Sequence, residues 1–600
     1  MEAHKGHKLL VADISRAFFY APATREVYVD LPEEDTGPGE VGLCGRLCYS
    51  LYGTRDAAQN WQSHVTKTMN GLGFISGKSS PCMFYNPEWG LRSFVHGDDF
   101  VTTGSPEALR WFGTVLKKVF ALTSTLLGPD ATDSKKVKIL NRLVTWVDGV
   151  GIQYEADPRH AQTLIREILG HDDKGIKTAV TPGVKGQEDS EKEIIKHIEE
   201  LKRDNTKMDK EEATSERKEE IHSYRSLAAT ANFMALDRAD IQYSVKEVAR
   251  KACDPESGDW DKLKRLALYL KGCPRAVTHF KFVAAEDFEA SSAELDIYTD
   301  SDWAGCRRTR RSTTGGCALW GGMLVKSWST TQTLVALSSG EAELYALVKA
   351  SAEGLGLQSL LADIGFKVVV RVKADASAAL GVVERRGLGR LRHVHTNFLW
   401  VQGCAANKSV KYMKEKGADN PADMFTKNVT RELINKFCKK IGVELRADEN
   451  EEGYKLGAME LVSEDIARAA EDASLEPWIR MDLKSCCLRG TRPGGPSTAS
   501  VVQRRTYRKD DGQLLHIDEM EDMKTGFKPF WSHRRFSKHL DTITVLLSMD
   551  QCRQKCSRRR CVLVVLLSCL GEATHTACFF IWSACMVFLF WVRVANRPVS

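Results

Sequence analysis

The stretch LDIYTDSDWAG, residues 295–305, alternates apolar and polar residues and then ends in acids, which is typical of a β-strand that carries a carboxylate. Residues 316–320 (GCALW) and 323–328 (MLVKSW) predict two further strands, joined by a two-glycine hairpin. A long helix is predicted to begin within residues 337–346 (LSSGEAELYA), where either serine is a plausible cap. Residues 293–430 are therefore expected to form a domain of their own.

Acids recur at the predicted ends of elements in this domain. A strand at 368–374 ends at Asp375, a helix is expected over 376–383, and a last helix is expected to start within 420–427 (NPADMFTK). Strand ends and helix starts bring acids from distant parts of a sequence together at one edge of a sheet. Each acid alone is equally well explained as a cap or a surface residue, but four at such positions favour a site with two bridging Mg²⁺ ions.

A second group of acids lies near the beginning of the chain. Residues 9–13 (LLVAD) form an apolar run that ends in a carboxylate, and residues 93–101 (SFVHGDDFV) predict a strand, a tight turn and a strand. Adjacent aspartates at a hairpin tip repel one another, and a divalent cation relieves that repulsion. Either piece alone is more simply explained as a solvated turn, whereas three carboxylates from neighbouring strands would suit two-metal phosphoryl transfer.

Composition sets broad limits on the class of protein. The chain has 600 residues, of which 43% are hydrophobic and 27% charged, which excludes collagen, a fully disordered chain and a polytopic transporter. Lys and Arg (85) exceed Asp and Glu (79) by 6, which permits nucleic-acid partners without arguing for them. The 17 cysteines contain no C-x-x-C pair, which argues against a structural zinc site.

The block at 293–430 resembles the RNase H domain of Ty1/copia-type LTR retrotransposons. The family pattern D-x-D-W-A-G, S-W-S, A-L-S-S-x-E-A-E, a strand with C-D-x-x-S-A, and A-D-x-x-T-K is matched in order, with Ala374 and Ala378 in place of the Cys and Ser of the fourth motif. This resemblance implies hydrolysis of the RNA strand of an RNA–DNA hybrid. The implied catalytic and metal-binding residues are Asp300, Glu343, Asp375 and Asp423. Glu343 is preferred to Glu341 because residues two apart on a helix face different sides.

The N-terminal part resembles the reverse transcriptase of the same family. Residues 11–18 (VADISRAF) are similar to its first catalytic motif, 51–61 (LYGTRDAAQNW) to its L-Y-G-L-K-Q-A-P-x-x-W signature, and 96–99 (HGDD) occupy the place of Y-V-D-D. The resemblance implies that Asp13, Asp98 and Asp99 are catalytic and hold the metal ions. It also implies roles at the incoming nucleotide or template for Phe18, Gly53 and Arg55.

The resemblance implies partners and cofactors for both sites. We expect two Mg²⁺ ions per site, with Mn²⁺ as an alternative, and as partners an RNA template, a DNA primer, an RNA–DNA hybrid and dNTPs. Two basic clusters near the RNase H acids are candidate phosphate contacts, although each is also explained as a solvated basic loop. Their proposed substrate-binding residues are Arg308, Arg310, Arg390 and Arg392.

The expected fold class is α+β or α/β, with a truncated palm-type domain, an RNase H-like mixed-sheet domain and a poorly ordered tail. The predicted divisions are a palm at 1–183 without the family's fingers, a charged linker at 184–221, a helical connection at 222–283, the RNase H-like domain at 293–430 and an unassigned tail at 448–560. Because the fingers supply contacts to the triphosphate and template, we expect polymerase activity to be impaired. An inactive relic that at most binds nucleic acid is the alternative function.

The last residues carry a hydrophobic segment at 561–592. Its second part has 20 residues without a formal charge, about one bilayer crossing. A transmembrane tail and read-through into a non-coding frame explain it equally well. The expected location is the cytoplasm, in a virus-like particle, or the nucleus, with a membrane as the alternative if the segment spans one.

Overall fold

The computed structural model describes residues 6–30, 44–170, 175–184, 215–283, 287, 292–389 and 391–447, with short strands at 488–489, 506–508 and 514–516. The chain divides into two compact units, one of residues 1–15, 68–465 and 577–600 and the other of residues 16–67 and 466–576. The hydrophobic segment at 561–592, most of the charged segment at 184–221 and most of the tail at 448–560 lie outside the described residues. Within the described ranges, no helix is long and apolar enough to cross a membrane.

The first sheet of the larger unit is antiparallel and has the strand order β4-β5-β6-β7-β1-β8. Helix α2 covers β1, β7 and β8, and its apolar face is buried because Ala108, Leu109, Phe112 and Leu116 recur at helical spacing. Ser105 caps this helix by accepting a hydrogen bond from the Ala108 N–H. The bounds are β1 Lys8–Ile14, β4 Ile75–Ser76, β5 Met83–Asn86, β6 Leu91–His96, β7 Asp99–Gly104, β8 Leu122–Leu127, α1 Ala57–Gly71 and α2 Pro106–Val119.

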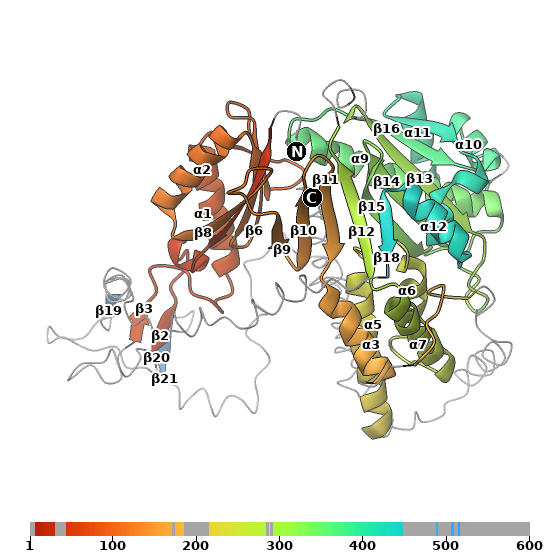
Figure 1. Ribbon diagram of the computed structural model, residues 1–600, viewed down its shortest axis with the longest axis horizontal. Helices are drawn as coiled ribbons and strands as arrows, with labels where there is room; N and C mark the ends of the chain where they lie inside the picture. The colour runs from red at the N-terminus through yellow and green to blue at the C-terminus, as the bar shows by residue number, and fades with distance from the viewer. Residues whose placement is uncertain are drawn as a thin grey trace. The chain divides into compact units, whose positions relative to one another are not determined.

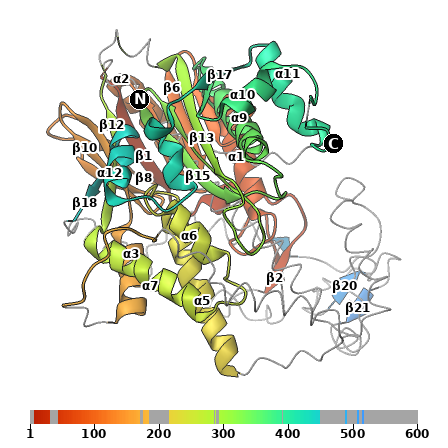
Figure 2. The same cartoon turned by 90° about the vertical axis from the view of Figure 1, so that its right-hand side faces the viewer.

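The second sheet is antiparallel, in the order β18-β12-β11-β10-β9, and helices α3, α5, α6 and α7 lie next to it (Figure 2). Leu227, Ala231, Met234 and Ala235 recur at helical spacing, and all four side chains lie in the core shared by these helices. The bounds are β9 Lys136–Ile139, β10 Arg142–Val147, β11 Gly151–Ala156, β12 Arg275–Lys281, β18 Val443–Arg446, α3 Pro158–Leu169, α5 Ser215–Met234, α6 Gln242–Ala249 and α7 Ser257–Gly272.

The third sheet is mixed and has the order β15-β14-β13-β16-β17. Strands β13, β14 and β15 are antiparallel neighbours, whereas β13 pairs in parallel with β16, and β16 in parallel with β17. Helix α9 packs against β13 and β16 (Figure 1). The bounds are β13 Glu294–Asp302, β14 Thr313–Trp320, β15 Met323–Thr331, β16 Val369–Ala374, β17 Val410–Lys414, α9 Ser339–Asp363, α10 Ser377–Glu384, α11 Trp400–Ala406 and α12 Arg431–Lys440, with 3-10 turns η4 Thr396–Leu399, η5 Gly417–Asp419 and η6 Pro421–Phe425.

Local sequence explains the elements of this sheet. The predicted two-glycine hairpin is confirmed, since Gly321 and Gly322 join β14 to β15 with φ of +58° and +76°, which side chains other than glycine rarely adopt. Ser338 caps α9 by accepting a hydrogen bond from the Glu341 N–H. The prediction that an α-helix starts within residues 420–427 is wrong. Asn420 caps the short 3-10 turn η6, and the α-helix α12 starts at Arg431. The described structure also continues past 430, through α12 and β18.

The described residues of the smaller unit contain a three-stranded sheet, a two-stranded sheet and the segment that leads into α1. Strand β3 (Cys44–Arg46) pairs with β2 (Tyr28–Asp30) and β19 (Leu488–Arg489), and β20 (Thr506–Arg508) pairs with β21 (Leu514–His516). The segment that leads into α1 begins with a 3-10 turn, η2 (Ala17–Tyr20). Taken together, the two units are mixed α and β with several sheets, as expected. The finer assignment to palm-type and RNase H-like domains stays a prediction.

Candidate active site

Three acids from distant parts of the sequence meet at one place in the third sheet. Asp300 lies on the central strand β13, Glu343 on α9, and Asp375 directly after β16. Each offers a carboxylate oxygen, and these oxygens all lie within 4.8 Å of one another. No other three acids, histidines or cysteines come so close in the part of the chain that the structure describes.

The fourth predicted acid, Asp423, is delivered to the same place by the turn η6. The Asn420 side chain donates a hydrogen bond to the Thr299 carbonyl on β13 (3.0 Å) and accepts one from the Ala422 N–H (3.1 Å). Asn420 is completely buried, so these bonds fix the start of η6 against β13. The negative charge of Asp423 acts on Asp300, which places the two carboxylates in one electrostatic neighbourhood.

Two acids of this site, Asp300 and Glu343, are buried, and one of them is incompletely satisfied. One oxygen of Glu343, Oε1, accepts hydrogen bonds from the Ser301 N–H (3.1 Å) and the Ser301 hydroxyl (2.9 Å). The other oxygen, Oε2, is buried and has no hydrogen-bond partner. Asp300 accepts a hydrogen bond from the Thr426 hydroxyl. A buried carboxylate oxygen without a donor is costly, so its position calls for a cation.

The electrostatics of the cluster point the same way. Burial raises the pKa of Glu343 to about 7, an effect that the Ser301 hydrogen bonds oppose and the charge of Asp375 reinforces. Burial, followed by the charges of Glu343 and Asp423, raises the pKa of Asp300 well above its ordinary value. Clustered carboxylates with raised pKa values ionise fully only when positive charge is supplied. Hard oxygen donors at this spacing fit a divalent ion of the Mg²⁺ type.

The two glutamates of α9 have separate environments, as predicted. Glu341 accepts hydrogen bonds from the Tyr345 hydroxyl, the Leu337 N–H and, at 2.8 Å, the His393 ring. These partners hold the pKa of Glu341 below its ordinary value against the effect of burial. Glu341 is therefore a buried, satisfied acid that connects α9 to the segment after α10, whereas Glu343 faces the acid cluster.

The predicted acids of the first sheet lie on one hairpin and its neighbour. The strand, tight turn and strand expected at 93–101 are confirmed, with Gly97 at φ +61° in the turn between β6 and β7. Asp13 on β1 lies opposite Asp99 on β7, and the Ile14 N–H donates to the Asp98 carbonyl at 3.0 Å. Partial burial and the charge of Asp98 raise the pKa of Asp13. These three acids do not form a group as tight as the one on the third sheet.

The residues predicted to contact the nucleotide belong to the smaller unit. The Phe18 ring lies 4.5 Å from that of Tyr52, centroid to centroid. Gly53 and Arg55 lie in two successive turns before α1, and Arg55 is exposed. Next to it, Asp56 pairs with Arg25 at 2.9 Å. Their role at the nucleotide stays a prediction.

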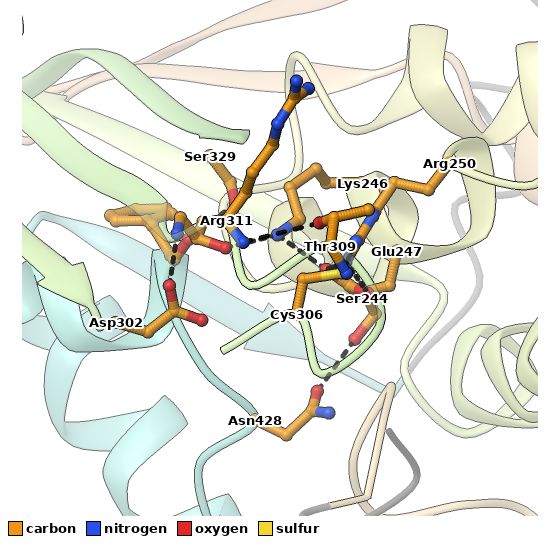
Figure 3. Close-up of polar contacts among 12 residues, drawn as sticks. Ser244, Lys246, Glu247, Arg250, Asp302, Cys306, Thr309, Arg311, Ser329 and Asn428 are labelled. Atoms are coloured by element: carbon orange, nitrogen blue, oxygen red, sulfur yellow. Dashed lines mark hydrogen bonds and ion pairs between the residues drawn. The ribbon is translucent and has the colours of Figure 1, made fainter. Parts of the chain in front are cut away.

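The basic loop at 306–311, between β13 and β14, is anchored to helix α6 (Figure 3). Cys306 is buried, and its sulfur accepts hydrogen bonds from the Arg250 guanidinium and the Thr309 N–H. Lys246 donates to the Thr313 hydroxyl at 2.6 Å, and Asp302 accepts from the Thr313 N–H. Burial raises the pKa of Asp302 to about 6. Asp302 therefore fixes the loop and does not join the acid cluster.

The predicted phosphate-binding arginines differ in exposure. Arg310 is exposed and Arg308 is half-buried, with a buried Nε that has no hydrogen-bond partner. Arg392 is exposed on the second basic segment, and Arg390 lies outside the described residues. An anchored loop with unsatisfied or exposed guanidinium groups is suited to contacts with phosphate.

Sequence reasoning missed three residues that complete the acid cluster. Ser301, Thr426 and Lys427 contact Glu343, Asp300 and Asp423 respectively. Thr426 and Lys427 are the last two residues of the matched A-D-x-x-T-K motif, and this motif was the available signal for both. No comparable signal marks Ser301, because its partner Glu343 is 42 residues away.

Comparisons with known proteins find retroelement proteins that are similar to this chain. It is 25% identical over 444 residues to the retrovirus-related Pol polyprotein from transposon TNT 1-94 of Nicotiana tabacum, which covers 72% of the chain. It is 23% identical over 452 residues to the one from transposon RE2 of Arabidopsis thaliana, again over 72% of the chain. The chain is a homologue of Ty1/copia-type retrotransposon Pol polyproteins.

The homologous region is a part of those larger proteins. The chain spans 30% of the tobacco Pol polyprotein and 27% of the Arabidopsis one. No family model matches it. Among solved structures, a foamy viral protease-reverse transcriptase in complex with dsDNA is 11% identical and covers 68% of each chain, with a TM-score of 0.16.

Proposed function

We propose that the chain hydrolyses the RNA strand of RNA–DNA hybrids at the cluster of Asp300, Glu343, Asp375 and Asp423. The observation that carries this proposal is the meeting of Asp300, Glu343 and Asp375, which each place a carboxylate oxygen within 4.8 Å of the others. Glu343 also has a buried oxygen without a donor. The mixed sheet supports it, because the resemblance to the RNase H domain implies a domain with a mixed sheet. Homology to Pol polyproteins supports the same class of chemistry.

The residues around the cluster have defined tasks in this reaction. Two divalent ions, Mg²⁺ or alternatively Mn²⁺, would lower the pKa of the attacking water and neutralise charge on the scissile phosphate. Ser301 orients Glu343 through two hydrogen bonds, and Thr426 orients Asp300. Arg308, Arg310 and Arg392 supply positive charge for the hybrid backbone.

We extend the proposal to RNA-directed DNA synthesis at Asp13, Asp98 and Asp99. The substrates would be an RNA template, a DNA primer and dNTPs. Support comes from the cross-strand position of Asp13 opposite Asp99 and from the electrostatic influence of Asp98 on Asp13. The more open arrangement of these acids makes this the less strongly supported of the two activities.

Two assays on the purified chain test the proposal. A labelled RNA–DNA hybrid with Mg²⁺ measures cleavage, and a primed RNA template with dNTPs measures extension. Asp375→Asn is the control, because Asp375 is half-exposed and its variant should fold. Cleavage by the wild type and not by Asp375→Asn supports the nuclease. A folded chain that binds the hybrid without cleaving it would instead favour an inactive nucleic-acid-binding relic.

A further inference from the structure

A lysine lies directly at the acid cluster. The Lys427 ammonium is 3.0 Å from an Asp423 carboxylate oxygen and 3.9 Å from Asp300 Oδ2. Its charge also acts on Glu343, and Asp375 acts on it in turn. One ammonium therefore interacts with all four acids that are proposed to hold metal ions.

The position of this lysine is fixed by its neighbour in the sequence. Thr426 is completely buried, its hydroxyl donates to Asp300 Oδ2, and its N–H donates to the Asp423 carbonyl at 3.2 Å. The Lys427 N–H donates to the same carbonyl at 3.3 Å. The lysine follows this anchor and is itself half-exposed, at 51% of its side-chain surface. Its backbone is thus held while its ammonium retains a path to solvent.

The electrostatic balance favours the charged lysine. The Lys427 ammonium lies 3.0 Å from an Asp423 carboxylate oxygen and 3.9 Å from Asp300 Oδ2, so both acids favour its positive charge. One positive charge neutralises only one of the four formal negative charges. The remainder still attracts a divalent ion, and such an ion would share Asp300 and Asp423 with the ammonium.

We propose that Lys427 is a built-in counter-cation that stabilises the metal-free acid cluster and competes with a divalent ion for Asp300 and Asp423. This inference rests on the proposed function only in its second half, since the first half concerns the metal-free protein. In the metal-free state the ammonium relieves repulsion among buried carboxylates. When a divalent ion binds, the ammonium leaves Asp300 for solvent, which its exposure permits, and this lowers the apparent affinity for the ion.

The metal-free half is tested by thermal unfolding in EDTA. Lys427→Met should lower the melting temperature by a few degrees, because the acids lose their counter-cation. Adding Asp300→Asn to Lys427→Met should restore it. Lys427→Arg, which keeps the charge, should remain near the wild type. The matched control is Lys436→Met, since Lys436 is similarly exposed (46%) and pairs with Asp419 at 2.9 Å instead.

The metal-dependent half is tested by calorimetric titration with Mn²⁺ alone, without nucleic acid. Lys427→Met should bind Mn²⁺ about fivefold more tightly than the wild type, as expected for removal of one nearby competing charge. Lys427→Arg and Lys436→Met should bind as the wild type does.

The outcomes separate this inference from the proposed function. An unchanged melting temperature and an unchanged Mn²⁺ affinity in Lys427→Met would overturn the counter-cation. A lower melting temperature in a chain that takes up no Mn²⁺ would support the metal-free role and count against the nuclease. If Lys427→Met fails to fold, the double variant with Asp300→Asn must fold, or the inference is wrong.

Discussion

The two groups of acids in this chain solve the same electrostatic problem differently. On the third sheet, Asp300 and Glu343 are 5% and 7% exposed and receive hydrogen bonds from Thr426 and Ser301. On the first sheet, Asp13 and Asp98 are exposed to solvent. Burial creates a site that is strained without a cation and prepared for one, whereas exposure lets water screen the same charges. The first arrangement should therefore bind metal without nucleic acid, and the second should depend on substrate to complete it.

The largest effect is expected for a substitution of Asp300 in the buried group of acids. Asp300→Asn should reduce hybrid cleavage about a thousandfold or more, because it removes a proposed ligand and several kcal/mol of transition-state stabilisation. The same variant should raise the melting temperature in EDTA, because a buried, repelled charge is gone. Cleavage kinetics and thermal unfolding measure the two effects. Asp302→Asn, two residues further along the strand, is the control and should lose less than about tenfold; equal losses in both variants would contradict the assignment.

The next effect is the pH dependence of stability without metal. A carboxyl whose pKa is raised on folding binds more protons folded than unfolded, so the free energy of unfolding falls as pH rises. For Glu343 the window runs from 4.5 to about 7. Its contribution to the free energy of unfolding should fall by about 3 kcal/mol across that window. Urea unfolding in EDTA at both ends of the range, for wild type and Glu343→Gln, measures the difference.

The outcome of that comparison is specific to the buried site. The free energy of unfolding of Glu343→Gln should fall with pH by about 3 kcal/mol less than that of the wild type. Saturating Mg²⁺ should reduce the pH dependence of the wild-type stability. Parallel pH profiles for the two proteins would show that Glu343 titrates normally, which would remove the main electrostatic distinction between the two groups of acids.

A smaller effect concerns the anchored basic loop. Substituting Arg308 and Arg310 together by Gln should weaken hybrid binding about tenfold and lower the salt dependence of log K by about 2, as expected for two lost phosphate contacts. The cleavage rate at saturating hybrid should remain unchanged. Binding titrations over a range of KCl concentrations measure this. Arg166→Gln on α3 is the control, and an unchanged salt slope in the double variant would exclude the loop from the nucleic-acid surface.

The smallest effect is expected at the exposed acids. Asp98→Asn should change the free energy of unfolding by less than about 0.5 kcal/mol, since both acids are exposed and solvent weakens, without abolishing, the repulsion of Asp13 by Asp98. Hybrid cleavage should be unaffected, whereas any primer extension should be lost. A large change in stability would show that this hairpin is as strained as the buried site and would erase the contrast between them.

The third sheet was predictable from sequence because its signals are local. Alternation over 295–302, the two-glycine hairpin and the serine cap before α9 each depend on neighbouring residues, and each is confirmed. The separation of Glu341 from Glu343 also followed from helix geometry. The turn η6 was not predictable in this way. Its form depends on the bond from Asn420 to Thr299, which lies 121 residues away in the sequence.

The structural role of the Arg238–Asp240 pair could not be predicted from the sequence. Arg238 and Asp240 form a buried ion pair, and the Tyr269 hydroxyl also donates to Asp240 at 2.8 Å. Nothing in their spacing distinguishes such a pair from a substrate contact. Only the packing of α7 and the start of β12 around them does so, and packing is not readable from one sequence.

The pairing of β12 with β18 determines which truncations and internal deletions of the chain leave the second sheet intact. These strands are antiparallel, with Thr278 opposite Val443, so the chain leaves and re-enters the second sheet at adjacent points. The acid-bearing sheet is thus the loop of a very large hairpin whose stem belongs to another sheet. Replacing residues 283–441 by a short turn should leave the stem able to close. A truncated chain that ends at residue 430 lacks β18, so β12 becomes an exposed edge strand. Exposed edge strands promote aggregation.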